Sequence, residues 1–210
     1  MDEKMSRLLR AREEMYHFLS RLYLFEVDET FFLQLGKFVF PKDCKNEDMT
    51  AGYEHMAAFI SGHTASKKDM DILAVDYAKV FLAAGIAAGQ AAFPYESVYA
   101  GTKHLVMQEA AGQMSALYAK KGLEPDTNMF KVPSDHVGLE LEYMALLCRE
   151  GDMGEQEVFF NTHLKNWVPV FCGEVIKYSE TDFYKGLGRL TRGFMATEEE
   201  LFQLLVLCEN

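Results

Sequence analysis

The stretch that decides the fold is PSDHVGLELEYM, residues 133–144. Its proline closes a loop, and either of the two residues that follow, Ser134 or Asp135, can cap a helix. Leu141 and Met144 then recur at helical spacing after Val137, which predicts a buried apolar stripe. The segment therefore predicts a packed helix that begins directly after a loop.

Three polar side chains of this segment, Asp135, His136 and Glu142, have no place on the apolar stripe. They predict a polar cluster at the exposed mouth of the packed helix. Such an arrangement suits a recognition site better than a purely structural segment. Asp135 also has a structural interpretation, as a helix N-cap that contributes about 1 kcal/mol of stability.

Helical periodicity continues over the rest of the chain, while alternating strand patterns are few. We expect an all-α protein, a single-domain helical bundle spanning residues 1–210, with a hinge loop at 122–133 that holds two of the five prolines. A break or kink is expected at Pro169, and a short C-terminal helix after the capping box of Thr197 and Glu200. The expected helices cover residues 3–25, 31–38, 47–61, 67–84, 97–121, 134–150 and 155–179.

Composition limits the classes of function. The chain has 210 residues and a formal net charge of -11, so nucleic acid is an unfavourable partner and a cationic segment a favourable one. The charged N-terminus has no apolar signal region, and no apolar stretch reaches the roughly 20 residues that span a bilayer. The four cysteines form no Cys-x-x-Cys pair. We expect a cytoplasmic protein without stable membrane insertion.

Residue patterns for catalysis or cofactor binding are weak. His136 and Glu140 are spaced i, i+4 and could share a metal ion with His163, but the sequence does not place His163 nearby. A surface hydrogen bond between His136 and Glu140 is the preferred interpretation. No phosphate-binding loop or nucleophile elbow is visible. We therefore expect no metal and no cofactor.

Two further clusters combine rings with polar groups. Tyr95 and Tyr99 flank the Glu96 carboxylate at the entry to a helix, and His163 lies one helical turn before Trp167. Rings beside acids suit a groove that holds a peptide with arginines and apolar residues, through stacking and charge-assisted hydrogen bonds. The structural alternative is that the single tryptophan is a core residue.

Four pieces of sequence, taken in order, resemble the TorD/DmsD/NarJ family of redox-enzyme maturation chaperones. They are DYxxVF at 76–81, PYESxY at 94–99, PxDHxxxELEYM at 133–144 and FxxHLxxWxPxF at 160–171. The resemblance implies an all-helical, non-enzymatic chaperone of the cytoplasm, a monomer or homodimer. Its implied partners are the catalytic subunit of a molybdopterin oxidoreductase and that subunit's twin-arginine signal peptide, held until cofactor is inserted.

The resemblance also implies a peptide-binding site. Asp135 and His136 match the family's peptide-binding motif, a second motif lies at 94–99, and a third contains His163 and Trp167. The site residues expected for the signal peptide are Tyr95, Glu96, Ser97, Tyr99, Asp135, His136, Glu140, Glu142, His163 and Trp167. Two alternatives stay open: a helical assembly factor that binds a folded partner without leader recognition, and a metal-dependent hydrolase that uses His136, Glu140 and His163.

Overall fold

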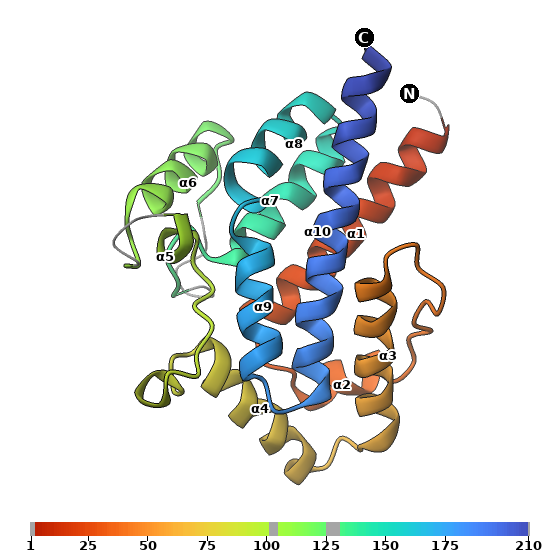
Figure 1. Cartoon of the computed structure of the whole chain (residues 1–210), viewed down its shortest axis with the longest axis vertical. Helices are drawn as coiled ribbons and strands as arrows, with labels where there is room; N and C mark the ends of the chain where they lie inside the picture. The colour runs from red at the N-terminus through yellow and green to blue at the C-terminus, as the bar shows by residue number, and fades with distance from the viewer. Residues whose placement is uncertain (1–2, 101–104, 125–130, 210) are drawn as a thin grey trace. The chain divides into compact units, whose positions relative to one another are not determined.

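The computed structural model describes residues 3–100, 105–124 and 131–209, and within these ranges all regular elements are helices (Figure 1). The predicted all-α class is confirmed. The elements are α1 (Glu3–Leu24), α2 (Glu29–Leu35), α3 (Glu47–Gly62), α4 (Lys67–Phe81), η1 (Ile86–Ala88), α5 (Glu96–Ala100), α6 (Glu109–Lys120), α7 (Val137–Glu150), α8 (Met153–Phe159), η2 (Phe160–Leu164), α9 (Val168–Tyr178) and α10 (Asp182–Glu209).

The chain forms two compact units, each built from segments distant in sequence. Unit 1 contains residues 1–24 and 94–168, and unit 2 contains residues 25–93 and 169–210. Both described ends of the predicted hinge, 122–124 and 131–133, belong to unit 1, and residues 125–130 lie outside the described residues. The hinge and the single domain stay predictions.

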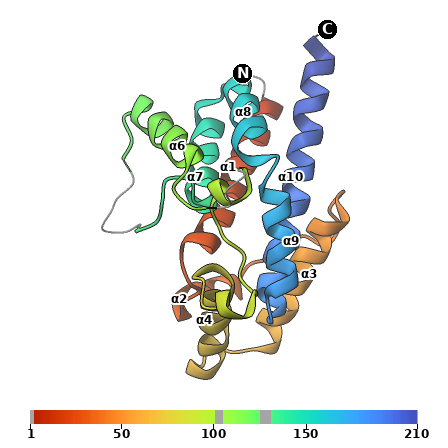
Figure 2. The ribbon, with the colours of Figure 1, turned by 60° about the vertical axis from the view of Figure 1, so that its left-hand side comes forward.

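In unit 1, α1 packs along α7, and α7 is followed by α8 (Figure 2). The face that α1 buries includes Tyr16, Leu19 and Tyr23, each fully buried. Gly138 in the first turn of α7 permits a close contact, because a Cβ atom there would lie 2.4 Å from Cγ of Leu24. The N-terminal helix thus supports the helix that carries the 133–144 motif.

In unit 2, α10 packs on α3 at backbone contact distance. A Cβ atom on Gly52 would lie 2.6 Å from the Leu190 amide nitrogen, and one on Gly186 would lie 2.7 Å from the Gly52 carbonyl oxygen. Small residues at the crossing let the two backbones approach this closely. Glycine is a weak helix former, but at this crossing its lack of a Cβ atom permits the two helices to pack.

The 76–81 motif has a structural role within unit 2. The buried carboxylate of Asp76 accepts hydrogen bonds from the amides of Glu180 (3.0 Å) and Thr181 (2.8 Å), directly before α10. The ring of Tyr77 lies 5.9 Å from that of Tyr184. The motif thereby joins α4 to the start of α10.

Three predicted helices differ from the structure. The 97–121 segment forms two helices, α5 and α6, and residues 101–104 between them lie outside the described residues. Thr197 lies inside α10 instead of at a helix start, and its hydroxyl donates to the Gly193 carbonyl (3.0 Å). The 155–179 segment changes winding at the π turn η2 and restarts as α9 at Val168, so Pro169 falls in a first turn, where no amide hydrogen is needed.

None of the helices in the described ranges combines the length and the apolar character needed to cross a bilayer.

The close approach of α3 and α10 leads to the first prediction. We expect Gly52→Ala to lower the free energy of unfolding by about 1–3 kcal/mol, because the added methyl group meets backbone that cannot move aside. Urea denaturation followed by circular dichroism measures this. The control is Gly62→Ala in the same helix, where an added Cβ has nothing within 4 Å. Equal losses in both variants would contradict the proposed contact.

Candidate functional site

The two motifs singled out in the sequence meet at one junction in unit 1. Tyr95 and His136 form an isolated antiparallel bridge. The Glu96 amide donates to the Asp135 carbonyl (3.0 Å), and the Val137 amide donates to the Pro94 carbonyl (2.8 Å). The segment before α5 and the segment before α7 therefore hold each other through their backbones.

Asp135 links the junction to the start of α5. Its fully buried carboxylate accepts, at Oδ2, a 2.9 Å hydrogen bond from the Ser97 amide and a second one from the Ser97 hydroxyl. Amides in the first turn of a helix have no partner within the helix, so Asp135 caps α5 from another part of the chain. The same Ser97 hydroxyl accepts from the Gln108 amide before α6 (3.1 Å).

The N-cap of α7 is His136, so the prediction that Ser134 or Asp135 caps this helix is wrong. His136 Nδ1 accepts from the Gly138 amide (3.1 Å), and its ring meets the Tyr95 ring edge-on at 5.3 Å. Burial lowers the pKa of His136 to about 3. The imidazole is therefore neutral, and its Nδ1 lone pair is available for the cap.

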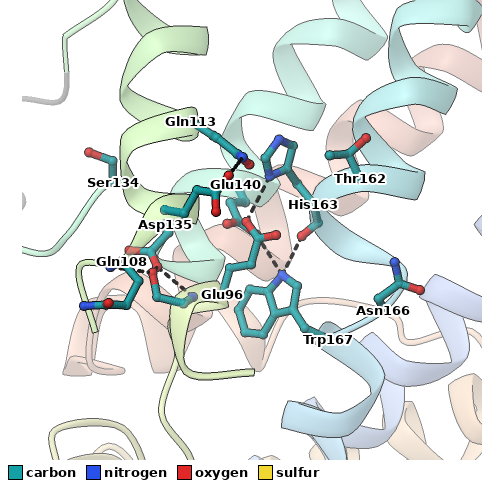
Figure 3. A network of polar contacts seen from close by, with 12 residues as sticks. Glu96, Gln108, Gln113, Ser134, Asp135, Glu140, Thr162, His163, Asn166 and Trp167 are labelled. Carbon is teal, nitrogen blue, oxygen red and sulfur yellow. Dashed lines mark hydrogen bonds and ion pairs between the residues drawn. The ribbon is translucent and has the colours of Figure 1, made fainter. Parts of the chain in front are cut away.

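A second polar group lies beside the junction, contributed by α5, α7, η2 and the turn that follows η2 (Figure 3). His163 Nδ1 lies 2.9 Å from Glu96 Oε2. Trp167 Nε1 donates to Glu140 Oε2 (3.2 Å) and to the His163 carbonyl. The Tyr99 ring stacks on Trp167 at 5.5 Å. Five of the predicted site residues are thus gathered in one network.

Glu140 is the most strongly perturbed acid of this network. Burial raises the pKa of its carboxyl well above the usual range, and the neighbouring carboxylate of Glu96 raises this pKa further. The predicted surface hydrogen bond between His136 and Glu140 is wrong, because both side chains are buried and His136 Nδ1 is used by Gly138. The hydrolase alternative grouped Glu140 and His163 with His136, whereas the structure groups them with Glu96.

The sequence pattern predicted a polar cluster at an exposed helix mouth, and this prediction is wrong. Asp135, His136 and Glu140 are at most 4% exposed. Glu142 is exposed on a different face of α7, where it pairs with His17 (2.9 Å). Tyr95 and Tyr99 are half-buried. The predicted set therefore divides into buried groups that define the junction, two rings at its border, and one separate surface acid.

Residues outside the predicted site set also hold the junction in place. The Tyr118 hydroxyl of α6 donates to the Ser134 carbonyl (2.9 Å), and the Ser115 hydroxyl lies 2.7 Å from the Ser134 hydroxyl. Gln108 was also missed, since its contact uses a backbone amide. Such contacts have no residue pattern that a sequence could show.

The fold is also found among solved structures. The all-helical fold is shared with a crystal structure described as a redox enzyme maturation protein from Archaeoglobus fulgidus, with a TM-score of 0.54 and 19% identity. The match covers 88% of this chain and 93% of the other.

The chain belongs to the nitrate reductase delta subunit family, whose model matches residues 42–173. It is 27% identical to the chaperone protein TorD of Shewanella pealeana, over 91% of this chain and 89% of that protein. It is 25% identical to the chaperone protein TorD of Shewanella piezotolerans, over 91% and 92% of the two chains. These findings confirm the predicted resemblance and the prediction of a non-enzymatic protein.

The buried histidine cap leads to a pH prediction. The pKa of His136 lies below its unfolded value of about 6.5, so below pH 6.5 the unfolded chain binds a proton that the folded chain does not. As the pH falls below this value, His136 lowers the free energy of unfolding of the wild-type protein by up to about 1.4 kcal/mol per pH unit. Asparagine also caps helices and does not titrate.

We therefore expect the stability of His136→Asn relative to wild type to rise by about 2 kcal/mol between pH 7.5 and pH 5. Parallel urea denaturations of both proteins at the two pH values measure the difference, and groups common to both proteins cancel. A difference that does not change with pH would show that His136 protonates freely in the folded state.

Proposed function

We propose that this chain is a cytoplasmic chaperone for a molybdopterin oxidoreductase. In this proposal it binds the twin-arginine signal peptide and the body of the catalytic subunit before cofactor insertion, and so delays export. Membership in a family of chaperones supports the class of function. The assignment of this partner and of the signal peptide as ligand rests on the resemblance of the 94–99 and 133–144 motifs.

The observation that carries the proposal is the junction of these two motifs in unit 1. Three acids, Glu96, Asp135 and Glu140, are buried there. The half-buried rings of Tyr95 and Tyr99 pack on His136 and Trp167 of the same site. A signal peptide offers paired guanidinium groups followed by an apolar stretch. Rings suit the apolar stretch and the flat faces of guanidinium groups, and acids suit their charge.

Burial of the acids determines how such a peptide would bind. Asp135 Oδ1 is buried without a hydrogen-bond partner in the described part of the chain, while Oδ2 already holds Ser97. We propose that the junction opens locally, and that a peptide arginine then bonds Oδ1. A charged hydrogen bond shielded from water contributes about 1.5–3 kcal/mol, whereas a solvent-exposed pair contributes less than about 1 kcal/mol.

The net charge of -11 supports the same ligand class. Long-range attraction accelerates the encounter with a cationic segment and is screened by salt. Binding in this proposal makes and breaks no covalent bond. The buried acids and rings hold the peptide while cofactor insertion takes place in the partner.

The corresponding prediction concerns Asp135→Asn. Asparagine keeps an oxygen for the Ser97 amide but loses the charge, so we expect the dissociation constant for a twin-arginine peptide to rise roughly 10-fold to 150-fold. Calorimetric titration measures it, and circular dichroism checks that helicity is retained. The control is Glu54→Gln, the same change of charge at an exposed position in unit 2. Unchanged affinity would exclude Asp135 as a contact.

A second arm of the experiment tests the ligand class. A peptide with two lysines in place of the arginines keeps the charge but loses the planar, bidentate donors. We expect the lysine peptide to bind wild type more weakly than the arginine peptide does. The difference in affinity between the two peptides should be smaller for Asp135→Asn. Equal capture of the oxidoreductase subunit with and without its leader would instead favour an assembly factor that ignores the signal peptide.

A further inference from the structure

Glu96, Glu140 and His163 form a compact group of metal-ligating side chains in unit 1. One ligand atom from each residue lies within 4.8 Å of the others. Their exposed fractions are 4%, 0% and 5%, so all three are buried. Figure 3 shows the two carboxyl groups and the imidazole turned toward a common region.

The group contains an oxygen that the protein's hydrogen-bond donors do not satisfy. Trp167 donates to Glu140 Oε2, but Glu140 Oε1 is buried without a hydrogen-bond partner among the described residues. Glu96 has one ion pair in the described part of the chain, to His163. Two neighbouring buried carboxyl groups need a counter-charge, which either a proton or a cation can supply.

The donor set indicates which cation fits. One imidazole nitrogen and two carboxylate oxygens are ligands of zinc and of related divalent transition metals. Calcium and magnesium prefer sites made of oxygen ligands alone. We propose that Glu96, Glu140 and His163 bind one divalent transition-metal ion of the Zn²⁺ class.

The geometry needs a small adjustment. Ligand atoms that bind one zinc ion at about 2.0–2.2 Å lie roughly 3.4 Å apart in a tetrahedral site. His163 Nδ1 and Glu96 Oε2, now 2.9 Å apart, would separate slightly to admit the ion, and Glu140 Oε1 would approach. Three protein ligands leave the fourth position to water.

The surroundings of the group resemble those of protein metal sites. Ligating carboxylates are themselves held by hydrogen bonds from neighbouring residues, as Trp167 holds Glu140 Oε2. His163 lies in the π turn η2, and π turns inside helices occur frequently at functional sites. A bound ion would join α5, α7 and η2, so its role is structural. This inference does not depend on the proposed function.

The test uses the full chain after treatment with a chelator. Calorimetric titration with Zn²⁺ measures stoichiometry and affinity, and the visible absorption of Co²⁺ reports the coordination geometry. Trp167 is the single tryptophan of the chain, so its fluorescence reports binding at Glu140 directly. We expect one equivalent of metal with a change in this fluorescence.

Two variants and a control assign the site. Glu140→Gln keeps an acceptor for Trp167 and removes the ligand charge, and we expect it to weaken Zn²⁺ binding about 100-fold or more. His163→Gln provides a second, independent removal of a ligand should Glu140→Gln fail to fold. Glu157→Gln, the same change of charge at a half-buried position in α8 of unit 1, should bind like wild type.

Two results would overturn the proposal. The first is wild-type protein that binds no Zn²⁺ at 100-fold excess, which would leave Glu96 and Glu140 as a pair that shares a proton. The second is a ligand-removing variant that folds and retains wild-type affinity, which would place the metal elsewhere on the chain.

Discussion

The site depends on the carboxylate of Asp135, which bonds the amide and hydroxyl of Ser97, 38 residues earlier in the chain. Helix α5 has five residues, far too few for a stable isolated helix. Its first turn persists because an acceptor from another segment satisfies its amide. Glu96 and Tyr99 lie on this short helix, so the positions of both depend on Asp135.

The buried acids make the junction costly to form. Glu96, Asp135 and Glu140 lie in unit 1 with little exposure, and each must be neutralised or hydrogen-bonded to remain buried. Asp135 is satisfied at one oxygen, Glu96 by His163, and Glu140 by Trp167 at one oxygen. The two remaining oxygens, Asp135 Oδ1 and Glu140 Oε1, are where a cationic ligand gains most. A peptide guanidinium suits Asp135 Oδ1, and a metal ion suits Glu140 Oε1.

The motifs that carry the family resemblance serve different purposes. The 76–81 motif stabilises unit 2 through Asp76 and the ring contact of Tyr77 with Tyr184. The 94–99 and 133–144 motifs form the junction, and the 160–171 motif supplies His163 and Trp167 to the network beside it. A shared sequence pattern in such a family therefore reports helix packing as well as the polar groups of the junction.

Sequence by itself determined the all-α class, most helix positions, and which residues are chemically unusual. Periodicity identifies a buried face because helix geometry repeats every 3.6 residues, and Asp135, His136 and Glu142 stand out because polar side chains have no place on that face. It could not tell that Asp135 caps α5, that Glu140 lies beside Glu96 and His163 instead of bonding His136, or that Glu142 belongs to another face. Those facts depend on contacts between segments many residues apart, and only the tertiary structure brings such segments together.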